Sequence, residues 1–293
     1  MQFDQLLQFI VSGITSGSIY ALIALGFTLI YNSTQVINFA QGEFVMLGGL
    51  SAVSLHSVLD LPLPAAFLLA VGIVTIVGIL FERVAIHPLR NSSIITLIIV
   101  TVGASILLKN IAMILWGRDS LTLPAFSGDK PVEILGAYIT PQTLWVIGLT
   151  TIAVLLLQVF YKRTIVGKAM KACSINQNAA KLMGINTSRI VLLSFAMSAA
   201  FGAMAGVLIT PISMVSYSAG GFLGLKGFAG AVLGGLGNPI GAVVGGVLLG
   251  VLESLSIGFI SSGYKDAVAF LILLLVLFFK PSGILGSRVK EKV

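Results

Sequence analysis

Long apolar runs alternate with short polar breaks along most of the chain, a pattern typical of membrane-spanning helices. A helix of roughly 20 residues crosses the hydrocarbon core of a bilayer. The runs predict spans at 6–31, 38–56, 62–82, 93–115, 141–161, 190–212, 220–236 and 240–258, and a last span that ends at Lys280. Because only 13 uncharged residues separate Asp266 from Lys280, the last helix is expected to begin before Asp266. We therefore expect residues 1–293 to form one all-α polytopic bundle of about eight or nine transmembrane segments.

Composition supports a membrane protein and argues against several other classes. The chain is 57% hydrophobic and 9% charged, whereas soluble domains carry about a quarter charged residues. One cysteine excludes an intrachain disulfide, and two histidines without carboxylates at ligand spacing predict no metal site. No phosphate-binding loop or catalytic Ser/His arrangement occurs. We expect no catalytic residues and no cofactor, only binding and movement.

Basic residues set the expected orientation. Six Lys or Arg and no acidic residue lie between 162 and 189, and Arg288, Lys290 and Lys292 follow in the tail. The positive-inside rule places 162–189 and the C-terminus in the cytoplasm, and 116–140 and the N-terminus outside. The net charge of +7 is therefore no sign of nucleic-acid binding. No Lys or Arg precedes Arg83, so no cleavable signal peptide is expected.

A weak internal similarity suggests an inverted repeat. An offset of 186 residues places Leu-Gly-Gly at 47–49 on the same triplet at 233–235, and Tyr31 on Tyr217. In the expected topology the two regions run in opposite directions, as repeats of transporters do.

Twelve glycines between 220 and 250 allow two interpretations. Small residues at every fourth position let helices pack closely in lipid. Alternatively, helices interrupted near 234–241, where Asn238 precedes a proline, would expose backbone to a transport pathway.

The segment 37–49 carries polar residues beside an apolar helix. Asn38 and Gln41 have the spacing of a capping box, and Glu43 would lie in the first helical turn, which favours a carboxylate. These residues either begin a helix near the cytoplasmic interface or line the permeation route, since ionisable groups within a membrane are usually functional. Glu253 and Lys226 pose the same question, and a Glu43–Lys226 pair is one option.

The basic segment 162–189 contains a predicted short helix at about 177–183 that ends at Gly184. Such a helix could dock on another protein. A solvated basic linker would explain its charge but not its length.

The residues "NAAKLMG" (178–184) resemble the coupling segment of ABC-importer permeases, whose pattern is Glu-Ala-Ala-x-x-x-Gly, with Asn178 in place of the Glu. Together with 17–49 and 227–246, they make the chain resemble LivH-type permeases of branched-chain amino-acid ABC transporters from about residue 8 to 285. The resemblance implies a multi-pass protein of the bacterial inner membrane, surrounded by lipid and working by alternating access. Its implied partners are a second, LivM-like permease, two ATPase subunits that hydrolyse ATP, and a periplasmic binding protein. The implied ATPase-coupling residues are Asn178, Ala179, Ala180, Lys181 and Gly184.

On this reading, the candidate pathway residues are Asn38, Gln41, Glu43, Asn238 and Glu253. The main alternative is an ion-coupled transporter or channel without ATPase partners, with its ion at Glu43 or Glu253. A membrane-embedded enzyme is disfavoured because the sequence offers no catalytic constellation.

Overall fold

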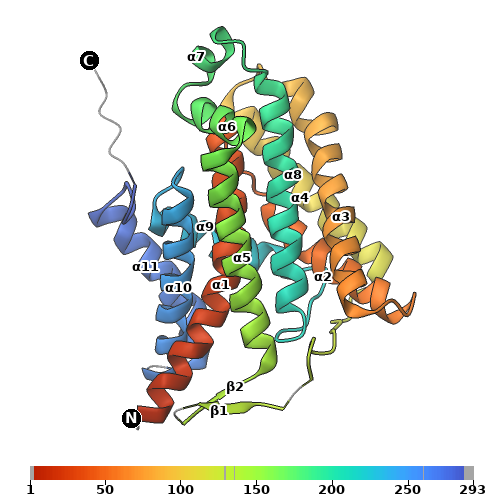
Figure 1. Ribbon diagram of the computed structural model, residues 1–293, viewed down its shortest axis with the longest axis vertical. Helices are drawn as coiled ribbons and strands as arrows, with labels where there is room; N and C mark the ends of the chain where they lie inside the picture. Colours follow the sequence, from red (N-terminus) through yellow and green to blue (C-terminus); the bar gives the residue numbers. More distant parts are fainter. Residues whose placement is uncertain (1–2, 129, 135, 260, 287–293) are drawn as a thin grey trace.

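The computed structural model describes residues 3–128, 130–134, 136–259 and 261–286, and the chain folds into a bundle of helices (Figure 1). The first part comprises α1 (Phe3–Thr34), α2 (Gln41–Ser57), α3 (Leu63–Phe81) with a π-helical turn (Glu82–Ile86) and a 3-10 turn (His87–Leu89), and α4 (Ile94–Trp116). The middle comprises the hairpin strands β1 (Val132–Ile134) and β2 (Ala137–Ile139), then α5 (Pro141–Arg163), α6 (Ile165–Ile175) and α7 (Gln177–Leu182). The last part comprises α8 (Thr187–Ile209), α9 (Ala219–Gly234), α10 (Pro239–Phe259), a 3-10 turn (Ser262–Tyr264) and α11 (Lys265–Phe279).

Among the described residues, seven helices are long and apolar enough to cross a membrane: α1, α3, α4, α5, α8, α10 and α11. The helices α2 and α9, with 17 and 16 residues, are shorter. The predicted polytopic helical bundle is confirmed, and two of its expected segments are short helices. As expected, the last helix begins before Asp266, at Lys265.

The bundle has two distinct ends (Figure 1). The start of α1 and the β1–β2 hairpin lie at one, which we call the hairpin end, and the Gln8 amide donates to the Tyr138 carbonyl there. The helices α6 and α7 lie at the opposite end, which we call the α7 end, where the Gln177 amide donates to the Ser33 carbonyl. The helix α1 therefore runs the length of the bundle.

The helices form two sets of four, α1–α4 and α8–α11, with matching contacts. The helix α1 packs on α10 while α3 packs on α8, and α1 also contacts α8 while α2 contacts α9. Exchanging the sets leaves this pattern unchanged, and α2 and α9 run in opposite directions, as in an inverted repeat. The offset of 186 is wrong, however. The first residues of α2 and α9, Gln41 and Ala219, are 178 residues apart, and the two Leu-Gly-Gly triplets fall in the middle of α2 and at the end of α9.

Two of the corresponding helices begin inside the bundle rather than at its ends. After α1, residues 35–40 lack regular secondary structure, and α2 starts beside Ser198 in the middle of α8. After α8, residues 210–218 lead to α9 in the same way. The two helix starts meet where Gly42 contacts Gly220 and Gly224, and a Cβ atom at Gly42 would overlap the Gly220 carbonyl. Glycine is therefore required for this close approach.

Candidate functional site: the meeting point of α2 and α9

Gln41 is fully buried and joins three helices. Its amide nitrogen donates to the Ser198 carbonyl at 3.1 Å, and the Ser198 hydroxyl lies 2.5 Å from its amide oxygen and 2.8 Å from the Gly26 carbonyl. Its side chain thus points to α8 and not back to Asn38, whose carbonyl oxygen accepts from the Ala40 N–H at 3.1 Å. The predicted capping box is therefore wrong, because tertiary partners in α1 and α8 take the Gln41 amide.

Glu43 carries a buried carboxylate that is only half bonded. Its side chain is 2% exposed, and Oε1 accepts a hydrogen bond from the Ser105 hydroxyl at 2.9 Å. Among the described residues, Oε2 has no hydrogen-bond partner. This oxygen lies against the first turn of α9, since a Cβ atom built on Gly220 would come within 2.5 Å of it.

A polar stripe on α4 faces the start of α2. Thr101, Ser105 and Lys109 are spaced by four residues and so share one helical face. The Thr101 hydroxyl accepts from the Phe39 N–H at 3.2 Å, and the Lys109 ammonium lies 5.8 Å from the centre of the Tyr217 ring. Exposure rises along the stripe, from buried Thr101 through half-buried Ser105 to exposed Lys109. The stripe therefore opens toward the hairpin end.

Asn38 lies deeper along the same line. It is 1% exposed, and its amide nitrogen has no hydrogen-bond partner among the described residues. A cavity of about 10 Å³ adjoins it, which is room for about one water molecule. The cavity is lined by Ile30, Thr34, Val36, Asn38, Ile86, Leu97, Thr101 and Phe195.

Glu253 belongs to a separate ionic cluster. The Lys226 ammonium of α9 lies 2.6 Å from Glu253 Oε1 and 2.7 Å from Asp266 Oδ1, and the Tyr20 hydroxyl donates to Glu253 Oε2 at 2.8 Å. The cluster ties α1, α9, α10 and α11 together. The suggested pair between Glu43 and Lys226 is therefore wrong, because Glu253 and Asp266 hold the Lys226 ammonium.

Asn238 lies at the α7 end, where it begins α10. Its carbonyl oxygen accepts from the N–H groups of Ile240 and Gly241, and its amide donates to the Leu285 carbonyl at 2.8 Å. The structure thus gathers Asn38, Gln41 and Glu43 in one place and sets Asn238 and Glu253 apart. These contacts favour a structural role for the latter two.

The coupling segment is exposed except at one residue. Ala180 is 4% exposed and packs into the core, whereas its neighbours Asn178, Ala179 and Lys181 are exposed. Gly184 follows the helix with a φ of +84°, a conformation that glycine adopts without strain.

Leu182 and Met183, which the sequence interpretation did not single out, are 88% and 84% exposed. Two adjacent apolar residues in an otherwise polar loop are the signal that could have identified them.

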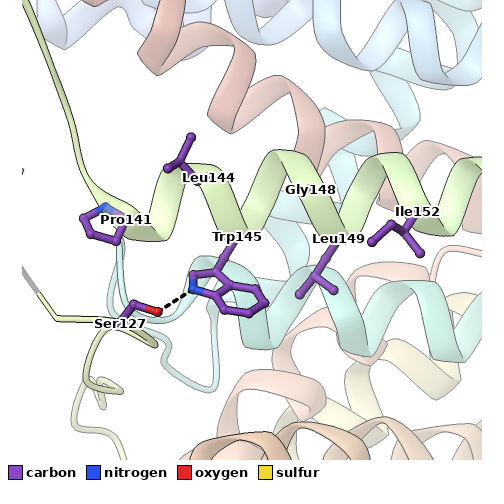
Figure 2. A pocket seen from close by; sticks show the side chains of 7 residues that line it. All are labelled: Ser127, Pro141, Leu144, Trp145, Gly148, Leu149 and Ile152. Carbon is purple, nitrogen blue, oxygen red and sulfur yellow. Dashed lines mark hydrogen bonds between the residues drawn. The ribbon is translucent and has the colours of Figure 1, made fainter. Parts of the chain in front are cut away.

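A surface pocket of about 450 Å³ on α5 has a different character (Figure 2). Its lining is apolar apart from Ser127, whose hydroxyl accepts from the Trp145 indole N–H at 2.8 Å. The lining residues are Ser127, Pro141, Leu144, Trp145, Gly148, Leu149 and Ile152. The pocket includes none of the polar residues at the α2–α9 meeting point.

Comparisons with known proteins agree on one family. The family model described as "Branched-chain amino acid transport system / permease component" matches residues 9–277. The permease protein LivH of the high-affinity branched-chain amino acid transport system of Escherichia coli is 39% identical, over 100% of this chain and 99% of the relative. The corresponding protein BraD of Pseudomonas aeruginosa is 36% identical over 98% of each chain.

A solved structure, PsaBC from Streptococcus pneumoniae in complex with Fab, is similar with a TM-score of 0.51. It is 15% identical over 96% of this chain and 94% of that one, so this likeness supports the fold alone. The full-length family match and the 39% identity show more: the chain belongs to the family of permease components of branched-chain amino acid transport systems.

Proposed function

We propose that this chain is the transmembrane permease subunit of an ATP-driven, ABC-type importer for branched-chain or other hydrophobic amino acids. The observation that carries the proposal is the full-length similarity to permeases named for that transport. The protein would form half of the translocation pathway in a bacterial inner membrane. A second, LivM-like permease would form the other half, and ATP would be hydrolysed on two partner ATPases rather than on this chain.

The proposed orientation places the α7 end in the cytoplasm and the start of α1 in the periplasm. The α7 end exposes all six basic residues of 162–189, in agreement with the positive-inside rule: Lys162, Arg163, Lys168, Lys171, Lys181 and Arg189. Arg288, Lys290 and Lys292, which carry the prediction for the C-terminus, lie outside the described residues. A periplasmic binding protein would deliver the substrate at the hairpin end.

We propose that α7 couples this chain to an ATPase. Its buried Ala180 seats the helix on the bundle, while exposed Leu182 and Met183 present an apolar edge suited to a groove on a partner. Asn178, Ala179, Lys181 and Gly184 complete the exposed surface. Because α8 begins at Thr187 and packs on α2, movement of α7 can reach the start of α2 through α8. Alternating access would follow from that movement.

We further propose that the pathway passes Asn38 and Glu43. Each carries a buried polar atom without a partner among the described residues, and such atoms are costly unless they serve a function. The contacts of Gln41, Asn238 and Glu253 are internal, so these residues would support the pathway walls.

The coupling proposal is tested with the reconstituted transporter and two matched variants. Leu182→Asp should abolish most ATP-driven uptake while the bundle remains folded, because Leu182 is 88% exposed. Ile165→Asp on α6, where the side chain is 86% exposed, is the control and should transport normally. Equal uptake in the two variants would contradict docking through α7. Uptake by the purified wild-type chain alone, without ATP, would favour the ion-coupled alternative.

A further inference from the structure

The free oxygen of Glu43 requires a partner that the described residues do not supply. A buried carboxylate without full hydrogen bonding is unfavourable, and ordinarily a cation or further donors compensate it. Glu43 Oε1 has the Ser105 hydroxyl, but Oε2 has no partner in the described part of the chain. The residue is 2% exposed, so bulk water does not compensate it either.

The opposite charge is available on the same polar stripe. The ammonium of Lys109 lies on the face of α4 that carries Ser105, close enough to act electrostatically on Glu43. The first turn of α9 adds partial positive charge, because Ser218 provides no side-chain cap and helix N-termini attract anions. The region thus offers one negative and two positive elements.

Apolar surface lies beside these charges. Phe39 and Leu225 are each 43% exposed, and Phe39 packs against Phe228 with ring centres 6.4 Å apart. Gly221, next to the residue that covers Glu43, is open, since a Cβ atom built there would meet no heavy atom within 4 Å. This surface suits an aliphatic side chain.

We propose that these groups form a site for the zwitterionic head group of an amino acid during its passage. The site lies between α4 and the start of α9. Glu43 and Ser105 would hold the ammonium, Lys109 and the first turn of α9 would attract the carboxylate, and Phe39 and Leu225 would contact the side chain. The proposal rests on the proposed transport function and names the part of the substrate that this chain recognises.

The charge pattern selects this class of ligand. A metal ion at Glu43 would be repelled by Lys109, and an uncharged ligand would leave both charges without partners. A ligand that carries both signs matches both groups. Because Gly220 covers Glu43, the ligand reaches the carboxylate when the first turn of α9 separates from α2.

The test measures protection of an engineered cysteine in the assembled transporter. Gly221→Cys is placed in a Cys173→Ala background, since Cys173 is the chain's one cysteine. The rate of labelling by N-ethylmaleimide is measured with leucine, with 4-methylpentanoate, which lacks the ammonium, and with 3-methylbutylamine, which lacks the carboxylate. Gly103→Cys on α4 is the control, because its position is equally open but points away from the stripe.

Leucine should slow labelling of Gly221→Cys about tenfold, whereas the two analogues should change the rate less than about twofold. The control should label at one rate throughout. Glu43→Gln should remove the protection by leucine. Absence of protection by leucine, equal protection by 4-methylpentanoate, or protection that survives Glu43→Gln would each overturn the proposal. ATP-driven uptake by the same preparation before labelling tests the transport function separately.

Discussion

The helices α2 and α9 hold corresponding places in the two halves of the bundle but treat their buried charges differently. Both begin inside the bundle without a side-chain cap, and each is tied by a polar contact to the last helix of its own half. On α2, Glu43 binds Ser105 of α4 and leaves one oxygen without a described partner. On α9, Lys226 is paired with Glu253 and with Asp266 of α11.

The difference separates a structural charge from one that is available to a ligand. In the ionic cluster on α9, each charge offsets the desolvation of another, so removal of one partner leaves a buried charge uncompensated. The Glu43 carboxylate has no ion pair at hydrogen-bond distance among the described residues, so its desolvation already counts against folding. We therefore expect the α9 cluster to stabilise the fold and Glu43 to act mainly in transport.

The largest effect is expected from Lys226→Met. It would leave Glu253 buried beside α1 without its cation, which should lower the free energy of unfolding by about 3–5 kcal/mol. Thermal unfolding of the purified permease measures this loss. Lys109→Met is the control and should unfold like the wild type, because Lys109 is exposed. Adding Glu253→Gln to Lys226→Met should recover part of the loss; no recovery would contradict the ion-pair explanation.

The second effect tests the close approach of the two helices. Gly42→Val would force a side chain into the Gly220 carbonyl, and overpacking of this kind costs about 1–3 kcal/mol. Gly221→Val on α9 meets open space and should cost less, so the pair isolates the crossing from general glycine effects. Equal unfolding temperatures in the two variants would show that the crossing tolerates a larger separation.

Hydrophobic runs predicted the membrane helices well because each long helix is apolar over its whole length. The start of α2 was less predictable. The run suggested a helix from residue 38, yet the helix begins at Gln41, since Asn38 and Phe39 bond locally and to α4 instead. The partners of Lys226 could not be read from the sequence, because Glu253 and Asp266 reach it only through the packing of α10 and α11 on α9.

The repeat shows the same limit. Identical triplets suggested an offset of 186, but the helices correspond at 178, because their positions are fixed by packing rather than by retained residues. The coupling segment was easier to locate, since Gly184 ends α7 in a conformation that favours glycine. Which face of α7 is buried depended on the contacts of Ala180 with the core, which a six-residue helix does not reveal by its pattern.

The smallest effect on stability is expected from Glu43→Gln, and it sharpens the comparison most. Glutamine keeps the shape and an oxygen that can accept from Ser105, while it removes a charge that is costly to bury. The free energy of unfolding should therefore change by less than about 1 kcal/mol, although uptake should fall strongly. Thermal unfolding and ATP-driven uptake of one preparation measure both quantities. A loss of stability as large as that of Lys226→Met would mean that Glu43, like the α9 cluster, holds the fold together. Unchanged uptake with unchanged stability would remove Glu43 from the pathway altogether.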